Sequence, residues 1–457
     1  MGLSEGMIIP HYLQSRISRR TVSNIQNISL TRELHIHNAN MYLESLQLFG
    51  IQFGLERIQR MCQLSGNPQD QYPSILIGGT NGKGSTAAFL DSILQARGLK
   101  TGLFTSPHLT SPLERIQINR EYIPIIRMTS YINDQKRIAQ ENGIDLTYFE
   151  FMTSIAFRYF MDENIDIGVF EVGLGGRFDA TNVLKSLITC ITHIHYDHTN
   201  YLGNTLKAIA LEKAGIVKRN GFFVHAEKRE SIKKIFKQIC MRNNTQYVDA
   251  LLHTNVHCKF KSPYIIADFE TPCGCYPSMK IPLLGFHQLN NALLAIRIAE
   301  ELANFGIVLD TAVIKSGIEN TAWNCRLEIV HEKPLALLDS AHNVEGIQRV
   351  LEFVDFLRTK KIIVVFGVLK DKQWKKMVKL VDYYADEIIL TEPVSDRALP
   401  PGNFSNLRLS SHCHIIKDPL EAYKNALQSA DDDSLILVTG SMYLVGYIKK
   451  HIRSLSG

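Results

Sequence analysis

A glycine-rich segment with one lysine carries the clearest chemical signal in the chain. The apolar run 74–77 leads directly into GGTNGKGST at residues 78–86. Glycines let backbone N–H groups close around a phosphate, a following helix N-terminus adds positive potential, and a lysine neutralises the outer phosphates. Gly84 stands between Lys83 and the hydroxyl of Ser85, so the segment departs from the strict GxxxxGKS/T motif. We nevertheless predict a nucleotide-binding loop rather than a structural glycine turn.

A carboxylate is predicted to face this loop. Glu171 lies at the end of the apolar segment 167–172, before a glycine turn that leads to Arg177 and Asp179. Mg²⁺ prefers oxygen ligands and bridges the phosphates of a nucleotide, so a carboxylate opposite the loop suits it. We therefore predict that Glu171 is a magnesium ligand. The alternative is a carboxylate that only caps the turn.

The segment ITHIHYDHTNYLG permits two interpretations. His193, His195, Asp197 and His198 match HxHxDH, the pattern with which metallo-β-lactamase-like hydrolases gather two zinc ions to activate water. Those hydrolases form a four-layer sandwich with further ligands downstream and no phosphate loop upstream. We prefer the nucleotide site, which places Asp197 and His198 at a strand end and His193 and His195 mostly within the strand.

Strands and helices that would position these groups alternate along the chain. The apolar runs that predict strands are 74–77, 167–172, 187–194, 335–338, 362–366, 387–390 and 434–438. Helical patterns cover 86–97, 291–305, 345–357, 373–384, 420–430 and 443–452. This alternation predicts an α/β fold with parallel sheets, in which ligands bind at the carboxyl ends of the strands. Prolines in 250–280 predict short hairpins.

The length of 457 residues predicts two or three domains. Residues 1–38 are predicted to be a poorly ordered extension; their arginines and serines leave an organellar transit peptide as the alternative. Residues 39–322 would form the nucleotide-binding domain and residues 326–457 a second α/β domain. The boundary is placed near 323–326.

Composition narrows the function classes. With 45% apolar residues and a net charge of +5, the chain is neither disordered nor a small disulfide scaffold. Near-balanced charge argues against a dedicated nucleic-acid binder, and no apolar run is long enough to span a membrane, so a soluble protein is expected. Eight scattered cysteines predict reduced thiols in the cytoplasm. Cys273 and Cys275 lie close together, but we prefer ordinary thiols there to a metal site.

Motifs along most of the chain together resemble one enzyme family. They are GLERI (54–58), GNP (66–68), GGTNGKGST (78–86), TSPHL (105–109), ERIQIN (114–119), TYFEFMT (147–153), EVGLGGRFDATNV (171–183), DHTNYLGNTL (197–206), EKAGIVK (212–218), LLGFHQLNNA (283–292), DSAHN (339–343), FGVLKDK (366–372) and VTGS (438–441). In this order they resemble the bacterial-type folylpolyglutamate synthases and dihydrofolate synthases of the Mur ligase superfamily. The resemblance implies a P-loop ATPase-like central domain followed by a Rossmann-like domain.

The same resemblance implies an ATP-dependent ligase that adds L-glutamate to dihydropteroate, to (tetrahydro)folate or to both. ATP would phosphorylate the acceptor carboxylate, and the amine of glutamate would displace phosphate through a tetrahedral intermediate. Mg²⁺ and K⁺ would assist. A cytoplasmic monomer is implied, or an organellar matrix protein if the extension is a transit peptide. A nucleotide-binding module without catalytic activity is a further alternative.

Individual residues receive roles from this resemblance. The nucleotide would contact Gly79, Thr80, Asn81, Gly82, Lys83, Gly84, Ser85, Asn291, Arg326 and Asp339. Magnesium would be held by Ser106, Glu171 and His198, and incoming glutamate by His342 and Ser441. Lys213 would react with CO₂ to become a carbamate near the metal. Lys83, Lys213, His198 and His342 would form the catalytic set.

Two segments depart from the family pattern. WNCR replaces WPGR at 323–326, and DSAHNVEG replaces DGAHNP from residue 339. Arg326, Asp339 and His342 are kept, but these departures leave the hinge geometry near Asn324 and Cys325 open.

Overall fold

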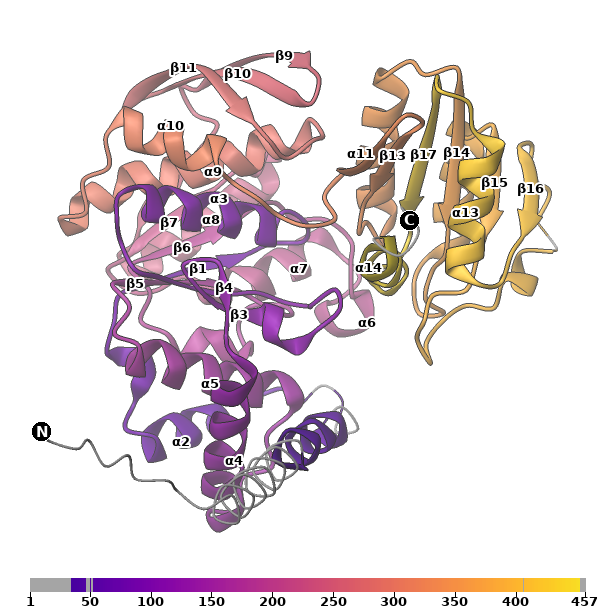
Figure 1. Ribbon diagram of the computed structural model, residues 1–457. Helices are drawn as coiled ribbons and strands as arrows, with labels where there is room; N and C mark the ends of the chain where they lie inside the picture. The colour runs from indigo at the N-terminus through magenta and orange to yellow at the C-terminus, as the bar shows by residue number, and fades with distance from the viewer. Residues whose placement is uncertain (1–33, 47–49, 51, 406, 453–457) are drawn as a thin grey trace, which may run out of the picture.

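The computed structural model describes residues 34–46, 50, 52–405 and 407–452, which form two lobes side by side (Figure 1). We call N-lobe the part that ends with α10 (Thr311–Glu319) and C-lobe the part that begins with β12 (Glu328–Glu332). Residues 323–326 lie in the connection between them. The predicted extension 1–38, with its transit-peptide alternative, lies almost entirely outside the described residues.

An eight-stranded sheet forms the centre of the N-lobe, in the order β4-β3-β2-β5-β1-β6-β7-β8. Its strands are β1 (Ser74–Gly78), β2 (Thr101–Phe104), β3 (Ile116–Ile118), β4 (Glu121–Tyr122), β5 (Ile167–Glu171), β6 (Ile188–Ile191), β7 (Phe222–His225) and β8 (Gln246–Asp249). Neighbouring strands pair in parallel except at β2–β3 and β3–β4, where the pairing is antiparallel. The phosphate loop therefore leaves the carboxyl end of a central strand.

Helices cover both faces of this sheet, which explains why its central strands β1, β5 and β6 are buried along their whole length. In β1, Ile75 and Ile77 face one core and Leu76 faces the other. The first core contains α3 (Lys83–Ala96), α9 (His287–Glu301) and α10. The second contains α2 (Glu56–Leu64), α4 (Ile125–Glu141), α5 (Tyr148–Asp162), α7 (Leu206–Lys213) and α8 (Glu230–Asn243). The helices predicted over 86–97 and 291–305 are confirmed as α3 and α9, the latter continued by a 3-10 turn (Leu302–Phe305).

A small antiparallel sheet lies at the far end of the N-lobe, beyond α9 and α10 (Figure 1). Its strands are β9 (Asn255–Lys261), β10 (Tyr264–Thr271) and β11 (Gly274–Ile281), which confirms the hairpins predicted in 250–280. Phe260 of β9 packs edge-on against Phe353 of the C-lobe, with ring centroids 5.7 Å apart. The first core thus continues across the lobe boundary.

The C-lobe is built on a six-stranded sheet in the order β12-β13-β17-β14-β15-β16, parallel except for β12. Its other strands are β13 (Leu335–Leu338), β14 (Lys361–Phe366), β15 (Glu387–Leu390), β16 (His412–Ile415) and β17 (Ser434–Thr439). Its helices are α11 (Val344–Phe356), α12 (Trp374–Tyr384), α13 (Pro419–Ser429) and α14 (Met442–His451). The strands and helices predicted here are confirmed to within one or two residues, and so is the α/β fold with a P-loop domain followed by a Rossmann-like unit.

Two further observations bear on the predictions from composition. No helix among the described residues is both long and apolar enough to cross a lipid bilayer. All eight cysteines are free, and four of them are buried.

Candidate active site at the lobe boundary

The phosphate loop joins β1 to α3 in a conformation that excludes side chains at two positions. Gly79 has φ +135° and Gly82 has φ +84°. A Cβ at Gly79 would overlap the Thr192 hydroxyl, and one at Gly82 would overlap the amide oxygen of Asn291. Lys83 begins α3, and its Nζ donates to the Thr80 carbonyl at 3.1 Å. Lys83 is thus folded back over the loop, as a phosphate-binding lysine requires.

Residues after β6 hold the loop in place. The Thr80 N–H donates to the His193 carbonyl at 3.0 Å, and the His195 N–H donates to the Thr80 hydroxyl at 2.9 Å. The Thr192 hydroxyl donates to the Asn81 carbonyl at 2.6 Å. The prediction that His193 and His195 belong to the strand is therefore wrong. β6 ends at Ile191: the Thr192 N–H still donates to the Gly78 carbonyl of β1, but His193 and His195 bond to Thr80 of the loop. Asp197 and His198 therefore lie beyond the strand end at which they were predicted.

Glu171 ends β5 beside the phosphate loop, as predicted. Its Oε2 accepts the Ser106 N–H at 3.1 Å, and its Oε1 lies 3.9 Å from Lys83 Nζ. Burial raises the pKa of this carboxyl, which the charge of Lys83 opposes. A Cβ at Gly84 would stand 3.3 Å from Glu171 Oε2, so the glycine allows the close approach. A buried carboxylate next to a serine and a phosphate loop is a donor set that suits Mg²⁺.

Ser106 lies in a loop that one carboxylate organises. Glu114 accepts the consecutive N–H groups of Leu109, Thr110 and Ser111 at 2.8 to 2.9 Å. Arg115 follows it, is buried, and donates to His108 Nδ1 at 2.8 Å. These bonds hold residues 109–111, while the Ser106 N–H is held by Glu171.

Lys213 reaches the phosphate loop from the last residue of α7. Its side chain is buried, and its Nζ donates to the Gly79 carbonyl at 2.8 Å. Burial, together with the nearby charge of Lys83, lowers the pKa of Lys213 to about 7. A neutral amine is the form that reacts with CO₂, so this environment is compatible with the predicted carbamate.

Asp197 joins the two lobes. Its Oδ2 accepts from Asn343 Nδ2 at 3.1 Å, and its Oδ1 lies 3.8 Å from Lys372 Nζ, both residues of the C-lobe. Burial opposes ionisation, but the charge of Lys372 holds the pKa of Asp197 well below its usual range. His198 follows in a left-handed conformation at φ 49°, and burial lowers the pKa of its imidazole.

His342 approaches the same place from the C-lobe. Its Nδ1 is paired with the Ser340 carbonyl at 3.0 Å. Burial and the charge of Lys372 lower the pKa of His342 to about 4, so its ring is neutral near pH 7. Asp197 Oδ1 lies 3.9 Å from His198 Nε2, and the charge of Asp197 also acts on His342 across the boundary.

Arg326, Asp339 and Ser441 occupy the edge of the C-lobe sheet. Arg326 is hydrogen-bonded to the Ser340 hydroxyl, and Asp339 accepts the backbone N–H groups of Leu327 and Ala341 at 2.9 and 2.8 Å. Burial raises the pKa of Asp339, which the charge of Arg326 opposes. Ser441 is buried, and its hydroxyl accepts the Tyr443 N–H at 3.2 Å at the start of α14.

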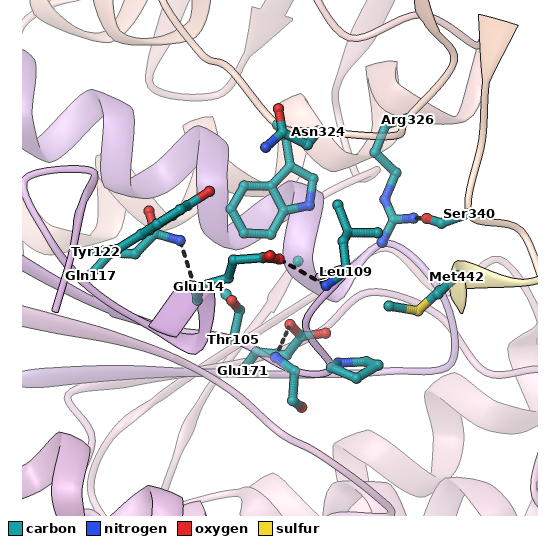
Figure 2. A pocket seen from close by; sticks show the side chains of 14 residues that line it. Thr105, Leu109, Glu114, Gln117, Tyr122, Glu171, Asn324, Arg326, Ser340 and Met442 are labelled. Atoms are coloured by element: carbon teal, nitrogen blue, oxygen red, sulfur yellow. Dashed lines mark hydrogen bonds between the residues drawn. The ribbon is translucent and has the colours of Figure 1, made fainter. Parts of the chain in front are cut away.

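Two cavities open along the boundary. The smaller, of about 60 Å³, has walls from both lobes (Figure 2): Gly84, Thr105, Ser106, Pro107, Leu109, Glu114, Gln117, Tyr122, Glu171, Trp323, Asn324, Arg326, Ser340 and Met442. The larger, of about 440 Å³, lies on the other side of the phosphate loop and includes Asn81, Gly82, Asn291, His193 and Glu345 in its wall. Neither wall contains Asp339, His342, Lys213 or Ser441.

Several residues at the boundary carried no predicted role. Asn343, Glu345 and Lys372 of the C-lobe each contact or face the N-lobe. Asn343 and Lys372 lie within the motifs DSAHN and FGVLKDK, and this position is the sequence signal that could have identified them. For Glu345 the sequence offers no such signal, except that the residue lies in a segment that departs from the family pattern.

The zinc interpretation of HxHxDH has no support. Within the part of the chain that the structure describes, no three His, Cys, Asp or Glu side chains gather as a metal site. His193 Nε2 is instead paired with Glu345 Oε2 at 3.0 Å. The sheet topology also differs from the four-layer sandwich of those hydrolases.

A nucleotide loop in one α/β lobe, facing the strand ends of a second, defines an ATP-dependent ligase of the Mur type. Residues 77–299 match the middle domain of Mur ligases, and residues 325–442 match the Mur ligase glutamate ligase domain. The chain is accordingly an ATP-dependent acid–amino-acid ligase.

Relatives identify the family. The chain is 34% identical to the dihydrofolate synthase/folylpolyglutamate synthase of Bacillus subtilis, over 91% of this chain and 99% of that protein. Its structure is similar to Mycobacterium tuberculosis folylpolyglutamate synthase complexed with ADP, with a TM-score of 0.85 and 28% identity over 93% and 99% of the chains. It is also similar to E. coli FolC in complex with DHPP and ADP, with a TM-score of 0.83 and 26% identity over 92% and 98%. The chain belongs to the dihydrofolate synthase/folylpolyglutamate synthase family.

Proposed function

We propose that this enzyme joins L-glutamate to dihydropteroate, to (tetrahydro)folate or to both, with MgATP as the energy source. The name of the Bacillus subtilis relative covers both acceptors. The E. coli structure contains DHPP and ADP, and the M. tuberculosis structure contains ADP. These names support the substrate class.

One observation carries the proposal. Asn81 of the phosphate loop contacts Asn343 and Glu345 of the C-lobe, with Nδ2 to Oδ1 and Oε2 distances of 3.3 and 3.0 Å. The triphosphate end of a bound nucleotide would thus lie between the two lobes. The phosphoryl group would then be transferred at a place where both lobes position the acceptor carboxylate and the amine of glutamate.

The chain's own groups supply charge neutralisation and orientation. Lys83 neutralises the outer phosphates, and the N–H groups of Gly79 to Ser85 bind them. Ser106, Glu171 and His198 would hold magnesium, which when bound screens the charge of the phosphates. Asn291 would contact the nucleotide from the larger cavity, while Asp339 fixes the turn that carries Arg326.

Transfer of the terminal phosphoryl group to the acceptor carboxylate gives an acyl phosphate. The neutral amine of glutamate then attacks its carbonyl carbon, a tetrahedral intermediate forms, and phosphate leaves as the amide is completed. We assign His342 and Ser441 to the binding of glutamate, since both lie at the C-lobe edge that faces the N-lobe. No covalent bond to the enzyme is needed.

The lobes must separate to admit substrates. Small-molecule sites typically measure about 300 to 1,000 Å³, a range that includes the larger cavity of about 440 Å³ beside Asn291 but not the cavity of about 60 Å³ beside Glu171. We infer that the lobes are closed around Glu171 and that they open there before each turnover.

The proposal also includes carbamylation of Lys213, a role for K⁺, a monomeric state and a cytoplasmic location. Of these, carbamylation has the most structural support, because Lys213 is buried, has a lowered pKa and touches the phosphate loop.

The test is direct. The purified protein is incubated with MgATP and labelled glutamate, each pterin acceptor is offered separately, and conjugates and ADP are measured. We expect glutamate-dependent ADP release and near-complete loss of it in Lys83→Ala, with exposed Lys424→Ala as the control. Unchanged ADP release in Lys83→Ala would mean that the loop is inert and that the protein is a binding module only.

A further inference from the structure

Glu345 of the C-lobe makes a set of contacts, and the proposed function gives this side chain no part in the reaction. Its Oε2 accepts from Asn81 Nδ2 at 3.0 Å and is paired with His193 Nε2 at 3.0 Å. Its Oε1 accepts from Arg349 NH2 at 2.7 Å. His195 Nδ1 stands 3.8 Å from the same carboxylate. One side chain of the C-lobe is therefore bonded to the phosphate loop and to the segment that supports the loop.

Contacts within the C-lobe fix the position of the Glu345 carboxylate. Glu345 lies in the first turn of α11, where the helix dipole favours a negative charge, and Arg349 is one turn later on the same helix. Asn343 caps the helix by accepting the Gly346 N–H at 2.8 Å. The orientation of α11 thus determines where the carboxylate lies.

Burial makes these contacts costly to lose. Only 10% of the Glu345 side chain is exposed. Burial alone would raise the pKa of Glu345, but the hydrogen bond and charge of His193, with the charge of Arg349, lower it to about 2. Removing one partner of a buried charge leaves the other uncompensated, which is more disruptive than loss of an exposed ion pair.

The phosphate loop receives the contact at a sensitive position. Asn81 lies between Thr80, which is bonded to His193 and His195, and Gly82, which has no room for a side chain. The Asn81 carbonyl is itself held by Thr192 at 2.6 Å. A shift of the Asn81 side chain is therefore transmitted to the N–H groups that surround the phosphates.

We propose that Glu345 is a positioning residue that couples docking of the C-lobe to the shape of the phosphate loop, with His193 as its partner on the N-lobe. The inference deepens the proposed function and rests on the use of ATP at this loop. When the lobes are open, the loop binds nucleotide without Glu345. When they close, the carboxylate fixes Asn81 and His193 for phosphoryl transfer.

The test separates binding from turnover. Glu345→Gln, His193→Gln and the double variant are compared with Asp355→Asn, which removes an exposed carboxylate from the same helix. We expect kcat for ADP release to fall about tenfold in each single variant, and the double variant to be no slower than the singles, because partners in one network are not additive. The Kd for the analogue AMPPCP, measured without acceptor, should stay within about twofold of wild type.

Three results would overturn the inference. Turnover of Glu345→Gln equal to that of Asp355→Asn means that the contact is passive. Additive losses in the double variant mean that the two residues act separately. A weakened AMPPCP Kd with kcat unchanged means that Glu345 binds nucleotide directly.

Folding and the proposed function are controlled separately. Circular dichroism and thermal unfolding show whether each variant is folded. If Glu345→Gln does not fold, His193→Gln, a change in the other lobe, still tests the pair. Absence of glutamate-dependent turnover in the wild type refutes the proposed function, and the inference with it. If the wild type turns over and Glu345→Gln turns over at the same rate, the inference is refuted and the proposed function is not.

Discussion

Gly446 of α14 lies directly against the backbone of Leu109, so that a Cβ on the glycine would overlap the Leu109 carbonyl oxygen. Leu109 belongs to the N-lobe loop that carries Ser106, and its side chain packs against the C-lobe core. A helix of one lobe thus rests on the loop that bears a proposed magnesium ligand of the other.

We predict that Gly446→Ala slows the ligase without unfolding it. The added methyl group pushes α14 away from the loop and prevents the closed arrangement. ADP release should fall about tenfold or more, while the melting temperature changes little, since the C-lobe core is untouched. Gly402→Ala is the matched control, because a Cβ there meets no atom within 4 Å. Equal rates for the two variants would contradict the prediction.

Gly79→Ala should abolish nucleotide binding. The new methyl group would overlap the Thr192 hydroxyl at a backbone conformation of φ +135°, which L-residues rarely adopt. Binding of AMPPCP by titration calorimetry gives the readout. Gly143→Ala has φ +62° and no neighbouring atom within 4 Å, so it should lose only about 1 to 2 kcal/mol of stability and keep its affinity.

Lys213 offers a test of carbamylation through pH. Because burial and Lys83 lower its pKa to about 7, the neutral amine that CO₂ requires increases as the pH rises through this value. Incorporation of labelled CO₂ should therefore rise between about pH 6 and pH 8. We expect Lys213→Ala to be inactive and to regain activity with added short carboxylates, whereas Lys213→Arg should not respond to them. Label retained in Lys213→Ala would place the modification elsewhere.

The Glu345 network predicts an acid-sensitive part of the stability. The pKa of Glu345 is lowered from 4.5 to about 2, so its contribution is present above about pH 4.5 and is lost as the pH falls toward 2. Urea unfolding should show wild type more stable than Glu345→Gln at pH 6, with the difference shrinking by pH 3. A difference that stays constant over this range would show that ionisation of Glu345 contributes nothing.

Local signals in the sequence predicted the fold, and they predicted that the glycine loop and Glu171 lie at the ends of their strands. A strand, a glycine loop and a helix follow one another directly at 74–96, and Glu171 ends an apolar strand, so both could be placed without knowing the tertiary structure. The carboxyl end of β6 was predicted too late because His193 and His195 exchange hydrogen bonds with Thr80, a residue more than 100 positions earlier. The contact of Asn81 with Glu345 depends on how the two lobes pack. The hydrophobic periodicity of the sequence predicts helices and strands but not the packing of one lobe on the other.

Glu114 has a mechanical consequence. Three successive backbone N–H groups donate to its carboxylate. Bending residues 109–111 would therefore break several hydrogen bonds together. This stretch therefore travels with its own lobe as an inflexible piece when the substrates enter and the product leaves. Each catalytic cycle then re-forms the reaction centre by bringing this preformed stretch into register with the facing lobe.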